Sequence, residues 1–145
     1  MTVPDVAQIR KRIQKAIEQA RREAADRRSL VHDSQKAYDE FLETRAIPAF
    51  RSVAVVLKSE GLSWEVMTPS GEVRLVPDRR RDESIALSFD ATAEPPQPTV
   101  NVTRGRGSRV VHLERPVKAG TPSSAALTED DVVSMLIEEL RPWLE

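Results

Sequence analysis

The stretch between Pro4 and Pro48 contains neither glycine nor proline and is rich in Arg, Lys, Glu, Gln and Ala, which favour helix. A single helix over this stretch would be about 60 Å long, whereas the strands of a small sheet measure about 17–20 Å. Part of the helix should therefore bury its apolar side chains against a partner, a second copy of the chain, or its own folded-back half. A fold-back would turn at residues 26–29, although no glycine, proline or asparagine marks a turn there.

The two ends of this helix carry recognisable signals. Thr2 is the candidate N-cap residue, which places Asp5 in the first turn at position N3. Pro48 should break or kink the helix, because proline lacks the N–H group and disfavours helix in the residue before it. The apolar stripe is thin and alanine-rich before residue 30 and thicker over residues 30–42, so we expect the second part to dock on the body and the first part to project.

A second helix is expected over residues 48–60, with Gly61 after its end. Glycine at this position favours a Schellman motif, in which Leu62 would contact Leu57. A last helix should begin at Thr128, because Thr128 and Asp131 have the spacing of a capping box.

Between these helices the apolar period changes to two, which is typical of strands with one buried face. Five short segments alternate in this way: 62–66, 73–75, 85–89, 100–102 and 111–113. Most connections between them are short, so the pattern predicts a five-stranded antiparallel meander covered on one face by helices. The fold class is therefore α+β. We expect a long helix over residues 1–46 as an assembly element and an α+β body over residues 47–145.

Several classes of chemistry have no support in the sequence. The chain has no cysteine, so disulfides and thiolate sites are excluded. His32 and His112 could share a metal only through a tertiary contact, and His32–Ser34 occupy consecutive helical positions that diverge by about 100°. We expect no catalytic residues, metal or cofactor. The chain has no apolar run long enough for a membrane span and no signal peptide, so we expect a cytoplasmic protein without a membrane partner.

Charge is unevenly distributed along the chain. Residues 1–30 hold eight basic and four acidic residues, although the net charge of the whole chain is −1. Nucleic-acid binding is therefore the alternative function, through basic side chains of the first helix and of a hairpin at residues 104–109: Arg10, Arg12, Lys15, Arg104, Arg106 and Arg109. Interleaved acidic residues and the lack of aromatic residues in the basic helix argue against it. The mixed-charge run Asp78–Glu83 is expected to be a solvated turn.

The preferred hypothesis is a non-catalytic interaction or adaptor protein that forms a homodimer and also docks an unidentified protein partner. The dimer interface is predicted on the apolar stripe of the first helix: Val6, Ile9, Ile13, Ile17 and Ala20. The second partner is expected on the polar face of the sheet: Glu65, Arg74, Ser88, Asn101 and His112.

Overall fold

The structure is a computed structural model that describes residues 3–145. The chain divides into two compact units, Met1–Asp33, here called the N-terminal unit, and Ser34–Glu145, here called the body. Helix α1 (Val6–Phe41) supplies the N-terminal unit and contributes its last turns to the body. Because α1 is helical throughout this range, the alternative of a fold-back at residues 26–29 is wrong.

Helix α1 begins with a reciprocal pair of side-chain hydrogen bonds. The backbone N–H of Gln8 donates to Oδ1 of Asp5 at 2.8 Å, and the backbone N–H of Asp5 donates to Oε1 of Gln8 at 3.3 Å. Each bond satisfies a donor that the first helical turn leaves free. Asp5 is therefore the N-cap residue and not a residue of the first turn as predicted, and Thr2 lies outside the described residues.

Pro48 does not end the helix, but the helical geometry changes just before it. A π-helical turn, Leu42–Ala46, joins α1 to helix α2 (Ile47–Ser59), and the N–H of Ile47 donates to the carbonyl of Leu42, five residues earlier. The proline ring would clash with the carbonyl four residues before it in a regular α-helix, and a wider turn relieves that clash. The predicted irregularity is thus a wide helical turn that ends just before Pro48.

The end of α2 has the predicted Schellman motif. The N–H of Leu62 donates to the carbonyl of Leu57 at 2.8 Å, and the N–H of Gly61 donates to the carbonyl of Lys58 at 3.0 Å. Gly61 has a φ of +85°, a conformation that a residue with a Cβ atom rarely adopts. This ending turns the chain from α2 into the first strand.

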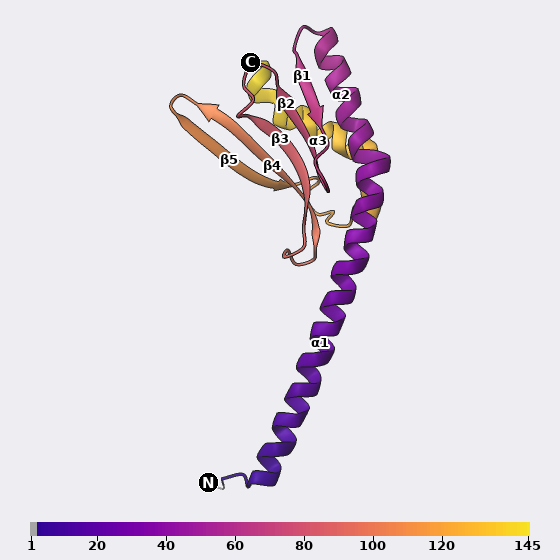
Figure 1. The fold of residues 1–145 in the computed structure, drawn as a ribbon, viewed down its shortest axis with the longest axis vertical. Coiled ribbons are helices and arrows are strands. Elements are labelled where there is room, and N and C mark those ends of the chain that lie inside the picture. Colours follow the sequence, from indigo (N-terminus) through magenta and orange to yellow (C-terminus); the bar gives the residue numbers. More distant parts are fainter. Residues whose placement is uncertain (1–2) are drawn as a thin grey trace. The chain divides into compact units, whose positions relative to one another are not determined.

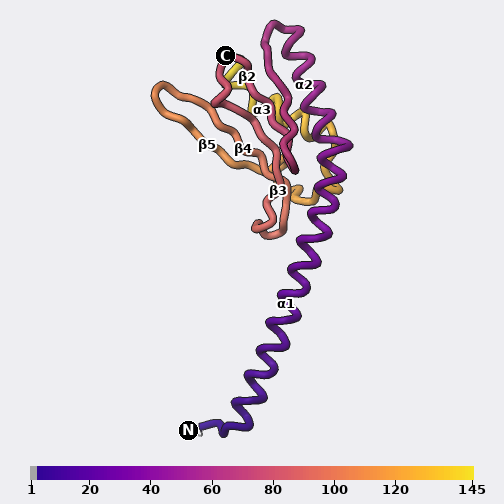
Figure 2. Tube along the Cα trace, viewed as in Figure 1, coloured from indigo at the N-terminus to yellow at the C-terminus, as the bar shows by residue number. Residues whose placement is uncertain are grey.

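The sheet is the predicted five-stranded antiparallel meander, and its strands lie in chain order (Figures 1 and 2). The strands are β1 (Trp64–Met67), β2 (Val73–Pro77), β3 (Ser84–Asp90), β4 (Gln97–Arg106) and β5 (Arg109–Pro116). Residues Arg106 and Arg109 are paired across the last hairpin, so Gly107 and Ser108 form its turn. Gly107 has a φ of +65°, as such a tight turn requires.

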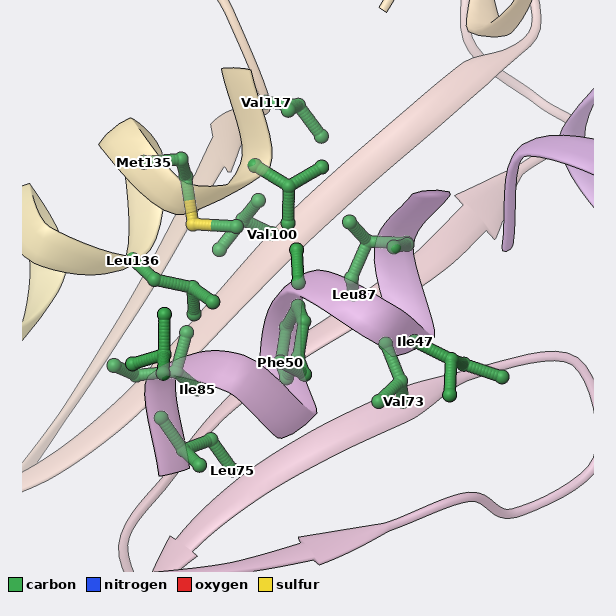
Figure 3. Packing of buried hydrophobic residues seen from close by; sticks show 14 of the residues in the cluster. Ile47, Phe50, Val73, Leu75, Ile85, Leu87, Val100, Val117, Met135 and Leu136 are labelled. Carbon is green, nitrogen blue, oxygen red and sulfur yellow. The ribbon is translucent and has the colours of Figure 1, made fainter. Parts of the chain in front are cut away.

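Helices α2 and α3 (Glu129–Leu144) both pack on one face of the sheet (Figure 1). Phe50 of α2 and Leu136 of α3 lie among aliphatic residues of the strands, such as Leu75 and Ile85 (Figure 3). The apolar residues of the five alternating segments lie on this face. Leu75, Leu87 and Val102 are buried, and Trp64, Phe89 and Leu113 are partly buried. The one-sided core is therefore confirmed.

Helix α3 starts where the capping box predicts. The hydroxyl of Thr128 accepts from the N–H of Asp131 at 3.1 Å, and the Asp131 carboxylate accepts from the N–H of Thr128 at 2.9 Å. The hydrogen bond from the Thr128 backbone is the main cause that lowers the pKa of Asp131, and Lys118 contributes. A charged carboxylate at a helix N-terminus is also favoured by the helix dipole.

The last turns of α1 belong to the core of the body. Tyr38 and Phe41 have no exposed surface. The Tyr38 ring lies 5.2 Å from the ring of Phe89, measured between centroids, and its hydroxyl donates to the carbonyl of Gly71. Burial raises the pKa of Tyr38 above its usual value, and the nearby carboxylates of Glu72 and Asp39 add to the effect.

Candidate functional site

The apolar stripe of α1 is exposed to solvent. Its residues are Val6, Ile9, Ile13, Ile17 and Ala20, and we call them the α1 stripe. The four large members keep 73, 43, 54 and 44% of their surface exposed, in chain order. Their spacing places them on one side of the helix. Exposed side chains of this size, aligned on one helix face, are typical of a surface that another molecule covers.

The five residues predicted on the polar face of the sheet do share one face. The register pairs Arg74 with Ala86 and Ala86 with Asn101, and Ser88 and His112 follow with the same alternation. Glu65 joins them through Val76, which is two residues from Arg74 on the same strand. Because α2 and α3 pack on the opposite side, we call this surface the open face.

Polar groups on the open face pair mainly with one another. Asn101 donates to the hydroxyl of Ser88 at 3.2 Å, and His112 Nδ1 lies 3.2 Å from the hydroxyl of Thr103. Glu65 forms an ion pair with Arg81 at 2.9 Å, and Arg74 is paired with Glu72. The open face therefore satisfies much of its own hydrogen-bonding capacity.

The basic residues of the alternative hypothesis lie in both units. Arg10, Arg12 and Lys15 are exposed on α1. Arg12 and Lys15 are three residues apart and lie on one side of the helix, but Arg10 points away from them. The other three lie on the β4–β5 hairpin, where Arg106 and Arg109 are exposed and Arg104 is half-buried. No single strip on α1 thus collects the basic side chains that were predicted to contact phosphates.

A pocket of about 360 Å³ in the body was missed by the sequence analysis. We call it the tryptophan pocket, and nine residues line it: Gly61, Leu62, Ser63, Trp64, Pro77, Arg79, Arg80, Glu83 and Trp143. The rings of Trp64 and Trp143 meet edge to face, with their centroids 5.3 Å apart and an interplanar angle of 86°. These are the only two tryptophans of the chain. The run expected to be a plain solvated turn, Asp78–Glu83, supplies three of the lining residues.

Glu83 holds several residues of the tryptophan pocket in place through its carboxylate. Its side chain is buried, and it accepts a 2.6 Å hydrogen bond from the N–H of Gly105 and a 3.4 Å bond from the indole N–H of Trp143. Nε of Arg80 lies 3.8 Å from the same carboxylate. The two oxygens of Glu83 therefore have partners in the protein, and the carboxylate joins the β2–β3 loop, the β4–β5 hairpin and α3.

Among residues 3–145, no group of three or more His, Cys, Asp or Glu side chains is arranged to hold a metal ion. The same part of the chain contains no helix with the length and apolar character needed to cross a membrane. The candidate sites are therefore the α1 stripe, the open face and the tryptophan pocket.

The chain matches no known protein family, no curated protein and no solved structure.

Proposed function

We propose that this chain is a non-catalytic interaction protein that self-associates through the α1 stripe. The observation that carries the proposal is the exposure of Val6, Ile9, Ile13 and Ile17, four large aliphatic side chains on one side of α1. Full burial of such a side chain contributes about 1.5–3 kcal/mol, and a partner would gain the part of this that corresponds to the surface still exposed. Helices in proteins are stabilised mainly by packing of an apolar face, so a molecule that covers the stripe would also stabilise α1 itself.

A second copy of α1 is the occupant that fits the stripe best, because large residues prevail toward one end of this face and small residues toward the other. The large residues lie between positions 6 and 17, and Ala16, Ala20 and Ala24 lie on the same face between positions 16 and 24. An antiparallel pair would place Ile9 opposite Ala20 and Ile13 opposite Ala16. Ile9 and Ile13 would then each meet a small side chain, which allows close approach of the two helices at these positions.

The charges of α1 favour the same orientation. Residues 6–14 carry three basic side chains and no acidic one, whereas residues 15–25 carry Glu18 and Glu23 beside three basic side chains. A parallel pair would place the basic halves side by side, and like charges at close range are unfavourable. An antiparallel pair would bring the acidic residues of one copy near the basic residues of the other. Two-fold homodimers are also the commonest soluble oligomers.

The open face has no role in this proposal. Each of its five predicted contact residues already pairs with a neighbour. A partner would have to replace those pairs, which would cost binding free energy.

The test is a pair of charge substitutions in the stripe. Ile9→Asp combined with Ile13→Asp would place two carboxylates in the proposed interface, so the double variant should be monomeric in sedimentation velocity. The body should remain folded, because neither residue belongs to its core. Near-ultraviolet circular dichroism, which reports Trp64, Trp143 and Tyr38, checks this.

The matched control is Gln14→Asp combined with Gln19→Asp. It introduces the same two side chains into the same helix at exposed polar positions outside the stripe, and it also removes the 3.2 Å hydrogen bond from Gln19 to Glu23. The control should sediment as the wild-type protein does. If both double variants have the wild-type association state, the stripe is not the interface.

A further inference from the structure

The tryptophan pocket combines two features of ligand sites, aromatic walls and an available cation. Trp64 and Trp143 are both partly buried, so each keeps some surface toward the pocket. Its volume of about 360 Å³ falls in the range of small-molecule sites, about 300–1,000 Å³. A ligand of one or two rings would fit this volume.

Arg79 is the cation that remains available. Arg80 pairs with Asp82 at 3.7 Å and with Glu83 at 3.8 Å, and Arg81 pairs with Glu65. Among the residues that the structure describes, no side chain forms an ion pair with Arg79, which is exposed and lines the pocket. A free guanidinium group binds a carboxylate through two parallel N–H donors.

The charge of the pocket favours an anion. Its lining contains two arginines and one carboxylate, Glu83, and the oxygens of that carboxylate already accept from Gly105 and Trp143. Glu83 therefore acts as a positioning residue that holds the Trp143 indole and Arg80. The pocket keeps one positive charge in excess beside its two aromatic rings.

We propose that the tryptophan pocket binds a small aromatic carboxylate, with the ring of the ligand against Trp64 and Trp143 and its carboxylate on Arg79. The flat ring would bury apolar surface against the indoles, and the guanidinium group would fix the orientation of the ligand. This site lies wholly in the body, so it does not depend on self-association through α1.

Tryptophan emission gives a direct test, because both tryptophans of the chain line the pocket. Phenylacetate added to the full-length protein should change the emission in a saturable manner, with a Kd of about 1 mM or tighter for a ligand of this size. Phenylacetamide, which has the same ring but no charge, should bind at least about tenfold more weakly if the Arg79 contact exists. Acetate, which has no ring, should produce no saturable change.

Two neighbouring arginines provide a matched pair of variants. Arg79→Ala should weaken phenylacetate binding by about tenfold or more, because it removes the ion pair. Arg81→Ala removes a guanidinium group from the same loop, but Arg81 pairs with Glu65 and does not line the pocket, so binding should stay within about twofold of wild type.

The proposal is overturned if phenylacetate causes no saturable change up to about 10 mM, well above the expected Kd. It is also overturned if the amide binds as tightly as the acid, or if the two arginine variants lose affinity equally. Circular dichroism of each variant verifies that the fold is retained.

Discussion

The hydroxyl of Tyr38 donates a 2.7 Å hydrogen bond to the carbonyl of Gly71, which joins the last turns of α1 to the turn between β1 and β2. Tyr38 is buried in the body, and this contact is partly buried. Ionisation of Tyr38 would leave a buried negative charge near the carboxylates of Glu72 and Asp39, and this is why its pKa is raised. The burial of Tyr38 should therefore make the stability of the body depend on pH in alkaline solution.

The direction of this pH dependence follows from comparing the pKa of Tyr38 in the folded and unfolded chain. In the unfolded chain Tyr38 ionises near its usual pKa of about 10, and in the folded chain it ionises at a higher pH. The stabilisation is thus fully present below about pH 10 and is lost as the pH rises above it. Urea unfolding between about pH 8 and pH 11 should show the free energy of unfolding falling in the upper part of this range. Tyr38→Phe, which cannot ionise, should reduce this fall.

The chain has a single tyrosine, so its ultraviolet absorbance provides a separate check. At about pH 11 the unfolded protein should show the phenolate band and the folded protein should show little of it. Equal phenolate absorbance in both states would contradict a raised pKa.

The loss in free energy of unfolding caused by a core substitution should depend on how deeply the residue is buried. Phe50 is fully buried at the centre of the core (Figure 3), so Phe50→Ala should lower the free energy of unfolding by about 3–5 kcal/mol. Phe89 is only partly buried, so Phe89→Ala should cost less. Urea denaturation of the two variants measures the difference. An equal or larger loss for Phe89 would show that the core is centred elsewhere.

Local signals in the sequence were sufficient for most of the fold. The alternation of apolar residues predicted all five strands, because a meander pairs neighbours along the chain and needs no long-range information. Gly61 and the Thr128–Asp131 pair marked helix ends for the same reason, since capping depends on residues a few positions apart. At α1, Thr2 and Asp5 are both good N-cap residues, and only the hydrogen bonds with Gln8 show which one begins the helix.

The tryptophan pocket depends on contacts between distant parts of the chain. Trp64 lies at the start of β1 and Trp143 near the end of α3, and no local pattern indicates that they meet. The run Asp78–Glu83 carries both charges, which favours a solvated turn, yet Glu83 is buried because Gly105 and Trp143 donate to it. A buried carboxylate satisfied by tertiary partners cannot be recognised from its neighbours in sequence.

The orientation of the proposed dimer can be tested by cysteine cross-linking, because the chain has no native cysteine. If the helices are antiparallel, Ile9→Cys and Ala20→Cys should each cross-link poorly alone and should form a disulfide when the two variants are mixed. If the helices are parallel, each variant should cross-link with itself and the mixture should add little. Oxidation followed by non-reducing electrophoresis separates these outcomes.

Nucleic acid should not bind appreciably to this protein. Acidic residues interleave with the basic ones on α1, and the first turn of α3 holds Glu129, Asp130 and Asp131, so no strong positive field covers the chain. Mobility shifts with duplex and single-stranded probes at about 50 mM salt should show no complex. A complex that weakens steeply with salt, and is lost when Arg10, Arg12 and Lys15 are all replaced by Glu, would support the alternative function.

The mass of the wild-type protein in solution tests the proposed self-association most directly. The chain has a mass of 16.2 kDa, and an interface on the α1 stripe predicts about twice that mass by light scattering at micromolar concentration. The stripe variant Ile9→Asp with Ile13→Asp should return the mass to that of one chain. A wild-type mass of 16.2 kDa that persists up to about 100 μM would contradict self-association through α1.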